Sequence, residues 1–134
     1  MNTDSKTSPV VETKAMLSTL WIVVMFCLLA ADVLSSYIPG SQEEMIAFAG
    51  GTPIPQLMLI AAIMNAIPIA MIFLSRILKV RANRWVNIIA VVITILYVVG
   101  GGSTYPHYIF LAGLEIVSML LIAWYVWKWP KQEA

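Results

Sequence analysis

The chain has few charged residues, one cysteine and one histidine, and these shortages exclude several classes of protein. Only 11% of its 134 residues are charged while 60% are hydrophobic, whereas soluble domains contain about 25% charged residues. The single cysteine, Cys27, excludes an intramolecular disulfide and a two-cysteine redox relay. Because paired metal-ligand motifs and glycine-rich phosphate loops are also missing, we expect no metal and no cofactor.

Long apolar runs occupy most of the sequence and predict an all-α integral membrane protein. Each run is close to the ~20 residues that a helix needs to cross a bilayer, or exceeds it. The expected spans are 15–37, 54–78, 83–100 and 107–128. The short links between spans predict an up-down four-helix bundle. Residues 1–14 are polar and are predicted to be a disordered N-terminus, residues 15–130 one membrane domain, and residues 131–134 a tail.

Two of the three links between spans lack positive charge, and this absence predicts the orientation. All eight Lys and Arg residues lie before the first span, at or between the facing ends of the second and third, or at or after the end of the fourth. Cytoplasmic loops retain positive charge, so both termini are predicted to be cytoplasmic and the links near 38–53 and 100–107 to be outside. The four basic residues between spans 2 and 3 are expected to set this topology and contact lipid headgroups, not nucleic acid.

The first outer link is predicted to contain a short helix, at about residues 42–49. Ser41 and Glu44 have the spacing of a capping box, in which Ser41 caps the helix and Glu44 bonds back. The apolar side of this helix predicts that it lies flat on the outer membrane surface. In the second span, Pro68 removes a backbone hydrogen bond and predicts a kink near residues 64–65.

Asp32 and Glu115 are the only acidic residues inside the predicted spans. Counting from the outer ends of their spans at 1.5 Å per residue puts them about 9 Å and about 10 Å deep, respectively. A charge that faces lipid costs about 2.5–3.5 kcal/mol, so both should point into the bundle, towards a pocket open to the outside. Two acids that share such a pocket repel, and one of them is expected to hold a proton.

Polar residues on the other spans complete the predicted pocket. Its expected ligand-binding or proton-binding residues are Asp32, Glu115, Asn65, Tyr97, His107 and Ser35. The same residues have structural interpretations, because Asn65 and Glu115 can hold helices together by hydrogen bonds. Asp32 can be a solvated group near the outer interface, and His107 an ordinary surface histidine.

Several segments resemble a family of small bacterial four-span membrane proteins of unknown function. The resemblance covers nearly the whole chain after residue 15 and includes ADVLS at 31–35, GTPIP at 51–55, SRILK at 75–79, EIV at 115–117 and WYVWKWP at 124–130. It implies a bacterial inner-membrane location and no assigned activity. The layout is also similar, more distantly, to that of DoxX-like membrane proteins, a likeness that carries no residue roles.

Three functions are compatible with these residues. The first is binding or transport of a small molecule or ion, coupled to protons, through an outward-facing pocket in the membrane. The second is a membrane-embedded enzyme that acts on a lipid-like substrate, with Asp32 or Glu115 as general acid or base. The third is a structural or accessory subunit in which the acids only join helices. A bundle of this size is expected to form a homo-oligomer, most simply a dimer.

Overall fold

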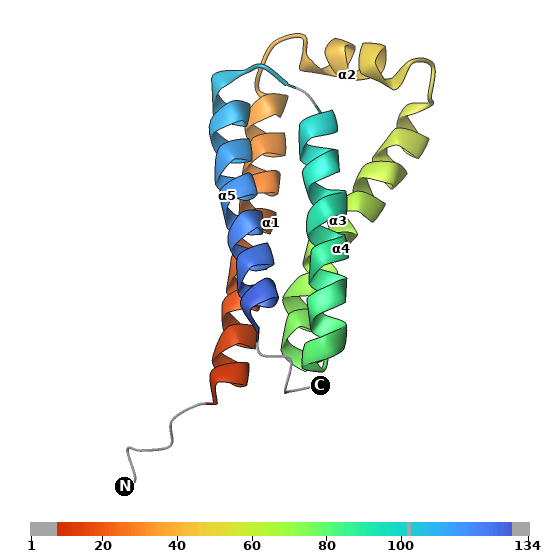
Figure 1. Ribbon diagram of the computed structural model, residues 1–134. Coiled ribbons are helices and arrows are strands. Elements are labelled where there is room, and N and C mark those ends of the chain that lie inside the picture. Colours follow the sequence, from red (N-terminus) through yellow and green to blue (C-terminus); the bar gives the residue numbers. More distant parts are fainter. Residues whose placement is uncertain (1–7, 102, 130–134) are drawn as a thin grey trace, which may run out of the picture.

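The computed structural model describes residues 8–101 and 103–129, and within these ranges all regular structure is helical (Figure 1). The five helices are α1 (Pro9–Ser36), α2 (Ser41–Ala49), α3 (Ile54–Ile77), α4 (Val80–Gly100) and α5 (Pro106–Lys128). All except α2 are long and apolar enough to cross a membrane. The molecule is therefore a multi-pass membrane protein, and the predicted all-α architecture with four spans is confirmed.

The first helix begins earlier than the sequence analysis expects. The Ser8 side chain accepts a hydrogen bond from the Val11 backbone N–H at 3.2 Å, and Pro9 occupies the first helical position. Both are common start signals, because the Ser oxygen satisfies a free N–H and proline is preset for a helix. Residues 9–14, which were assigned to the disordered N-terminus, form the first turns of α1. The rest of that segment, residues 1–7, lies outside the described residues.

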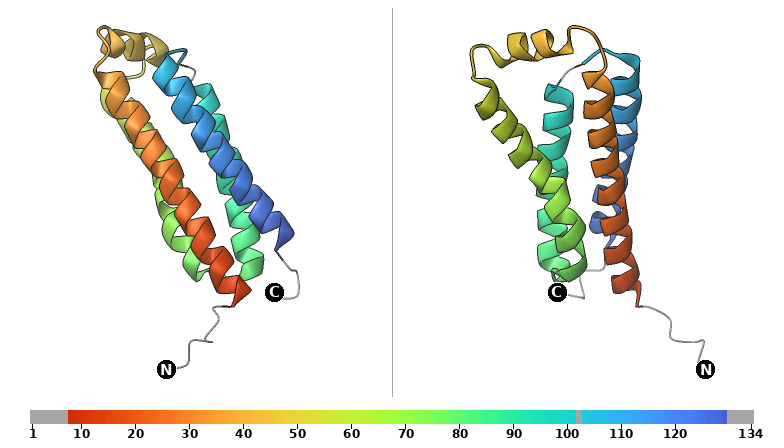
Figure 2. Two further views of the ribbon diagram at one scale, coloured as in Figure 1. Left: turned by 90° about the vertical axis from the view of Figure 1, so that its left-hand side faces the viewer. Right: turned by 180° about the vertical axis from the view of Figure 1, so that it is seen from behind.

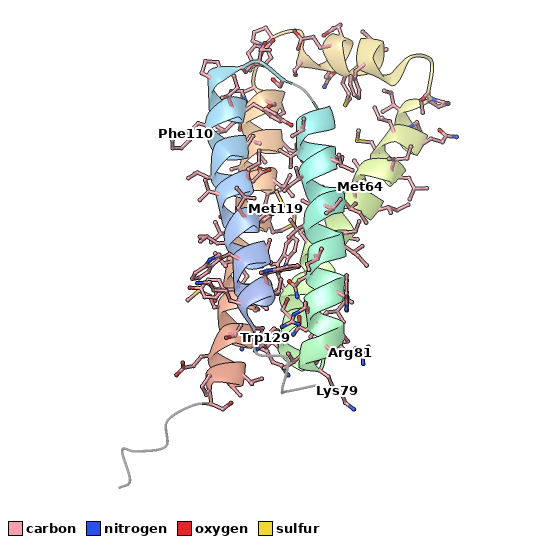
Figure 3. The ribbon with its side chains drawn as sticks, viewed as in Figure 1. Met64, Lys79, Arg81, Phe110, Met119 and Trp129 are labelled. Atoms are coloured by element: carbon pink, nitrogen blue, oxygen red, sulfur yellow. The ribbon has the colours of Figure 1, made fainter. Side chains whose placement is uncertain are left out.

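The four long helices pack as a ring in which α1 contacts α3 and α5, and α4 contacts the same two helices. Consecutive long helices run antiparallel, and α2 lies across one end of the bundle between α1 and α3 (Figures 1 and 2). Figure 3 shows Met119 directed into the bundle, Phe110 directed away from it, and Lys79 and Arg81 at the end opposite α2. We call the end that carries α2 the α2 end and the other the basic end.

Helix α2 occupies the predicted position, but the predicted capping box is wrong. The N-cap is Gly40, whose φ of 84° lies in the left-handed region, and Ser41 is already helical. Glycine is favoured here because a side chain would strain that conformation. The carboxylate of Glu44 accepts a hydrogen bond from the Tyr105 hydroxyl at 2.8 Å instead of bonding back to its own helix.

A buried polar network joins α1, α3 and α4 in the half of the bundle near the basic end. The indole N–H of Trp21 donates to Asn87 Oδ1 at 2.7 Å, and the Ser75 hydroxyl donates to the same atom at 3.4 Å. The Asn87 amide donates to the Asn83 carbonyl at 2.8 Å, and the Asn83 amide donates to the Ser75 carbonyl at 2.8 Å. All four side chains are 0% exposed, so these bonds stabilise helix contacts away from water and lipid.

Two arginines close this half of the bundle at its end. Arg84 donates to the carbonyl oxygens of Val126 and Trp129 at the end of α5. Arg76 donates to the Ser18 hydroxyl at 3.1 Å. A guanidinium group at the end of α5 satisfies carbonyls that have no partner in the helix and opposes the negative end of its dipole.

The half of α3 nearer the α2 end leans away from α1 and α4 (Figure 2). From residue 54 to residue 67 every side chain is exposed or half-buried, and burial begins at Pro68. A proline inside a helix lacks the N–H that would bond four residues back, which allows the helix to bend there. The bundle is consequently closed near the basic end and looser near the α2 end.

Candidate functional site

Glu115 is the most deeply buried ionisable side chain in a long helix of the described chain. It lies on α5 and is 1% exposed, and its Oε2 atom has no hydrogen-bond partner among the described residues. Burial of an unpaired carboxyl group costs free energy unless a proton or a partner compensates for it. A group of this kind inside a membrane protein is therefore a candidate for function.

Two other helices carry buried oxygen atoms that lack a partner within the described ranges. They are Thr94 Oγ1 on α4 and Asn65 Oδ1 on α3. Folded proteins leave few buried polar atoms unbonded, so each such atom calls for an explanation. Trp129 Nε1 is a further one, but it lies at the basic end with Arg84.

Contacts between α1 and α5 fix the level of Glu115 in the bundle. The hydroxyl of Ser35 lies 2.9 Å from Nε2 of His107. The two helices are antiparallel and rise equally per residue, so eight residues further along both of them Cys27 lies level with Glu115.

A contact between α1 and α3 fixes the level of Asn65 in the bundle. The Ser18 hydroxyl donates to the Ile72 carbonyl at 2.8 Å, which fixes the register of α1 against α3. Seven residues towards the α2 end from this contact, Asn65 lies level with Met25, two residues from Cys27. The amide of Asn65 is therefore within about half a helical turn of the level of Glu115.

The bond between Arg84 Nε and the Val126 carbonyl, 2.9 Å long, places these two residues within one arginine side-chain length of the same level. Ten residues from each towards the α2 end, Thr94 lies within about one helical turn of the level of Ile116, the neighbour of Glu115. The three unpartnered oxygens on α3, α4 and α5 thus form one layer of the bundle. We call Asn65, Thr94 and Glu115 the polar layer.

Asp32 lies on α1, nearer the α2 end than this layer. By the register of α1 against α5 it is five residues, or about 7.5 Å, above the level of Cys27 and Glu115. It is four residues after Leu28, a core residue that is 7% exposed, yet the side chain of Asp32 itself is exposed. Asp32 is thus an exposed carboxylate about one and a half helical turns above a buried one.

Among the six predicted site residues the structure shows one direct contact, between Ser35 and His107. Asp32 and Tyr97 lie on α1 and α4 in the same half of the bundle as Glu115. Asn65 reaches the level of Glu115 from α3, although no hydrogen bond joins the two in the described chain. Their assignment as ligand-binding or proton-binding residues stays a prediction.

Two neighbours are missing from the predicted pocket. Cys27 lies level with Glu115, and the Tyr108 hydroxyl donates to the Val98 carbonyl at 2.6 Å. Thr94, which the third span offers as a polar residue, belongs to the polar layer, and its spacing of seven residues from Asn87 places both on one helix face. Nothing in the sequence marks Tyr108 as an inward residue, because it stands close to a span boundary.

One polar contact joins the two links at the α2 end. Tyr105 OH donates to Glu44 Oε1, and this hydrogen bond, followed by desolvation and then by the negative charge of Glu44, raises the pKa of the tyrosine above its usual value of 10.0. The tie holds α2 against the segment before α5. No group of three or more His, Cys, Asp or Glu residues in the described ranges is arranged to hold a metal ion.

Four spanning helices around a layer of buried polar atoms define a small membrane bundle with an internal polar site. A protein-family model matches residues 10–134, and the chain belongs to that family, a family of unknown function (DUF6326). The resemblance to a family without an assigned activity is thereby confirmed. No curated protein and no solved structure matches the chain.

Proposed function

We propose that the protein binds a small cation in exchange for a proton, at a site formed by Asp32 and the polar layer. The observation that carries the proposal is the buried Oε2 atom of Glu115, which lacks a partner while a second acid lies close by. A proton on Glu115 neutralises the site when it is empty. A cation that replaces this proton is bound by the two carboxylates and by the oxygens of Asn65 and Thr94.

The proposal includes an orientation and a location. The α2 end, which carries no Lys or Arg, faces outwards, and the basic end with both termini faces the cytoplasm. We place the protein in the bacterial inner membrane, with α2 at the outer interface, and we take its working form to be a homo-oligomer. The site then opens to the outside, as binding or uptake of an external small molecule requires. The likeness in layout to DoxX-like proteins is compatible with this placement and assigns no residue.

The test is difference infrared spectroscopy of the purified protein from about pH 4 to about pH 9. Ordinary carboxyl groups titrate at the acidic end of this range. We expect a protonated carboxyl band that persists through the acidic part of this range and is absent from Glu115→Gln. In Asp32→Asn the band should remain, because Glu115 is unchanged. Two ordinary solvated carboxylates, with no band assigned to Glu115, would refute the proposal.

The leaning of α3 is a specific observation in favour of the second candidate, an acid/base enzyme acting on a lipid-like substrate. Such an enzyme needs a site that is open sideways to the bilayer, and the outer half of α3 is the least buried part of the four long helices. Conversion of added phospholipid by wild type and not by Glu115→Gln would favour this candidate. The third candidate, a purely structural role, suits the bonded network around Asn87 better than the unbonded Glu115.

A further inference from the structure

The side of the bundle between α1 and the leaning half of α3 is incompletely covered. The inward stripe of α3 includes the buried residues Pro68 and Met71, and its continuation towards the α2 end consists of Leu57, Ala61 and Met64, which are only half-buried. Residues spaced three or four apart share one helix face, so the face that is covered below Pro68 is only partly covered above it. We call this partly covered part of the bundle the opening.

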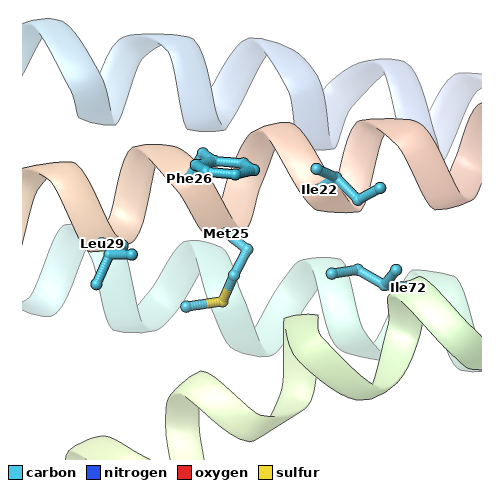
Figure 4. Close-up of a pocket in the computed structure, with 5 residues that line it drawn as sticks. All are labelled: Ile22, Met25, Phe26, Leu29 and Ile72. Atoms are coloured by element: carbon cyan, nitrogen blue, oxygen red, sulfur yellow. The ribbon is translucent and has the colours of Figure 1, made fainter.

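An apolar groove runs along the outside of the α1–α3 contact just below the opening (Figure 4). All the side chains that line it are apolar: Ile22, Met25, Phe26, Leu29 and Ile72. Between Ile22 and Leu29 the helix rises about 10 Å. The groove thus offers a hydrocarbon chain of about that length a place beside the helices.

Asp32 connects the groove with the interior. It is three residues after Leu29, which lines the groove, and four after Leu28, which belongs to the core. On a helix it therefore projects between these two directions, one turn nearer the α2 end. Its exposed carboxylate lies at the top of the groove, five residues or about 7.5 Å along the bundle from the level of Glu115.

Lys and Arg are absent from this half of the bundle, and acids outnumber bases in it. The acids Asp32, Glu43, Glu44 and Glu115 belong to it, and the sequence has no Lys or Arg from residue 15 to 75 or from residue 85 to 127. The basic side chain of His107 lies at this end and contacts the Ser35 hydroxyl through Nε2 at 2.9 Å. An occupant of the groove with a positively charged head would supply a counter-charge for Asp32 and Glu115.

We propose that the groove and Asp32 bind an amphipathic organic cation that enters sideways from the bilayer between α1 and α3. The charged head lies between Asp32 and Glu115, and the hydrocarbon tail lies along Leu29, Met25 and Ile22. This proposal rests on the proposed function for the role of the two acids, and it adds the substrate class and the path of entry. An uncharged or anionic lipid lacks the complementary charge for this position.

The experiment measures equilibrium binding of radiolabelled dodecyltrimethylammonium to the protein in nanodiscs of uncharged lipid, with empty nanodiscs as the background. We expect saturable binding of the labelled cation. Tetramethylammonium, which has no tail, should compete at least about tenfold more weakly than unlabelled dodecyltrimethylammonium, a difference that equilibrium constants resolve easily. Dodecanol, which has the tail without the charge, should not compete at the same concentration. Asp32→Asn should lose saturable binding, and Asp32→Glu should retain it.

A pair of leucine variants separates groove binding from nonspecific partitioning. Leu29→Trp fills the groove, whereas Leu120→Trp places the same side chain on a face of α5 outside the groove, and the two leucines are 53% and 57% exposed. We expect Leu29→Trp to bind at least about tenfold more weakly than Leu120→Trp. Equal size-exclusion profiles and equal helical content of the two variants would show that both are folded.

The outcomes distinguish this inference from the proposed function. Equal binding by the two tryptophan variants, or equal competition by dodecanol, would overturn the inference while leaving the infrared signal of Glu115 and the cation site intact. Loss of the Glu115 signal would refute the proposed function by itself. If Leu29→Cys forms a disulfide-linked dimer and wild type binds no amphiphile, a second copy of the chain occupies the groove, and the inference is wrong.

Discussion

The two halves of this bundle treat buried polar groups in opposite ways. Near the basic end, Trp21, Ser75, Asn83 and Asn87 are fully buried and bonded to one another. Near the α2 end, one buried oxygen each of Glu115, Thr94 and Asn65 has no partner in the part of the chain that the structure describes, and α3 leans away from α1 and α4. Bonded polar groups stabilise helix association, whereas unbonded ones cost stability. The comparison indicates a structural half and a binding half within one chain.

The largest expected effect tests the structural half. Asn87→Ala removes the acceptor of the Trp21 and Ser75 bonds and the donor to Asn83. We expect the free energy of unfolding to fall by about 2–3 kcal/mol, because buried donors are left without partners. Unfolding in mixed micelles at increasing denaturing-detergent fraction measures it. Asn65→Ala is the matched control, and an equal loss in both variants would contradict the division into two halves.

The next effect tests the binding half and has the opposite sign. Glu115→Met replaces a buried, unpartnered carboxyl group with an apolar side chain of similar length. We expect stability to rise by about 1–2 kcal/mol, because the desolvation cost disappears. The same unfolding measurement applies, and Met119→Leu at a buried position of α5 is the control. A clear loss of stability in Glu115→Met would show that Glu115 has a structural role.

A smaller effect is expected at the junction of α4 and α5. A Cβ added at Gly101 would lie 2.9 Å from the Tyr108 hydroxyl and 3.4 Å from the Tyr97 carbonyl. Gly101→Ala should therefore displace the hydroxyl from the Val98 carbonyl, at a cost of about 1 kcal/mol for the lost hydrogen bond. Tyr108→Phe removes the bond directly. The double variant should therefore be no less stable than the less stable of the two single variants. Full additivity would disprove the shared mechanism.

The smallest effect concerns the tie between α2 and α5, and it depends on pH. The pKa of Tyr105 is raised by its hydrogen bond to Glu44, so the stabilising contribution is complete below the usual tyrosine value of about 10. It is lost as the pH rises through the higher folded pKa, because the ionised hydroxyl can no longer donate. Limited proteolysis of residues 38–53 should accelerate above that pH in wild type and be pH-independent in Tyr105→Phe. An unchanged rate in wild type would disprove the tie.

The sequence predicted the fold well and the pocket incompletely. Apolar length is a local property, so the four spans follow directly from runs of residues. Proline and serine signals also act locally, yet the polar composition of residues 1–14 predicts disorder and outweighs the Ser8-Pro9 start signal of α1. The capping box failed because Glu44 found a partner, Tyr105, that is distant in the chain. Long-range hydrogen bonds of this kind leave no local pattern.

The sequence by itself determined which segments lie in the bilayer and which in water, and it limited the side chains that are available for chemistry. Hydropathy and charge are summed along the chain, and they made Asp32 and Glu115 conspicuous before any packing was known. Only the tertiary structure decided that Glu115 is buried without a partner, that Asp32 is exposed at the top of an apolar groove, and that α3 leans away beside it. Burial and pairing depend on which helices meet and at what register, and that register was set by contacts such as Ser18 with Ile72 and Ser35 with His107.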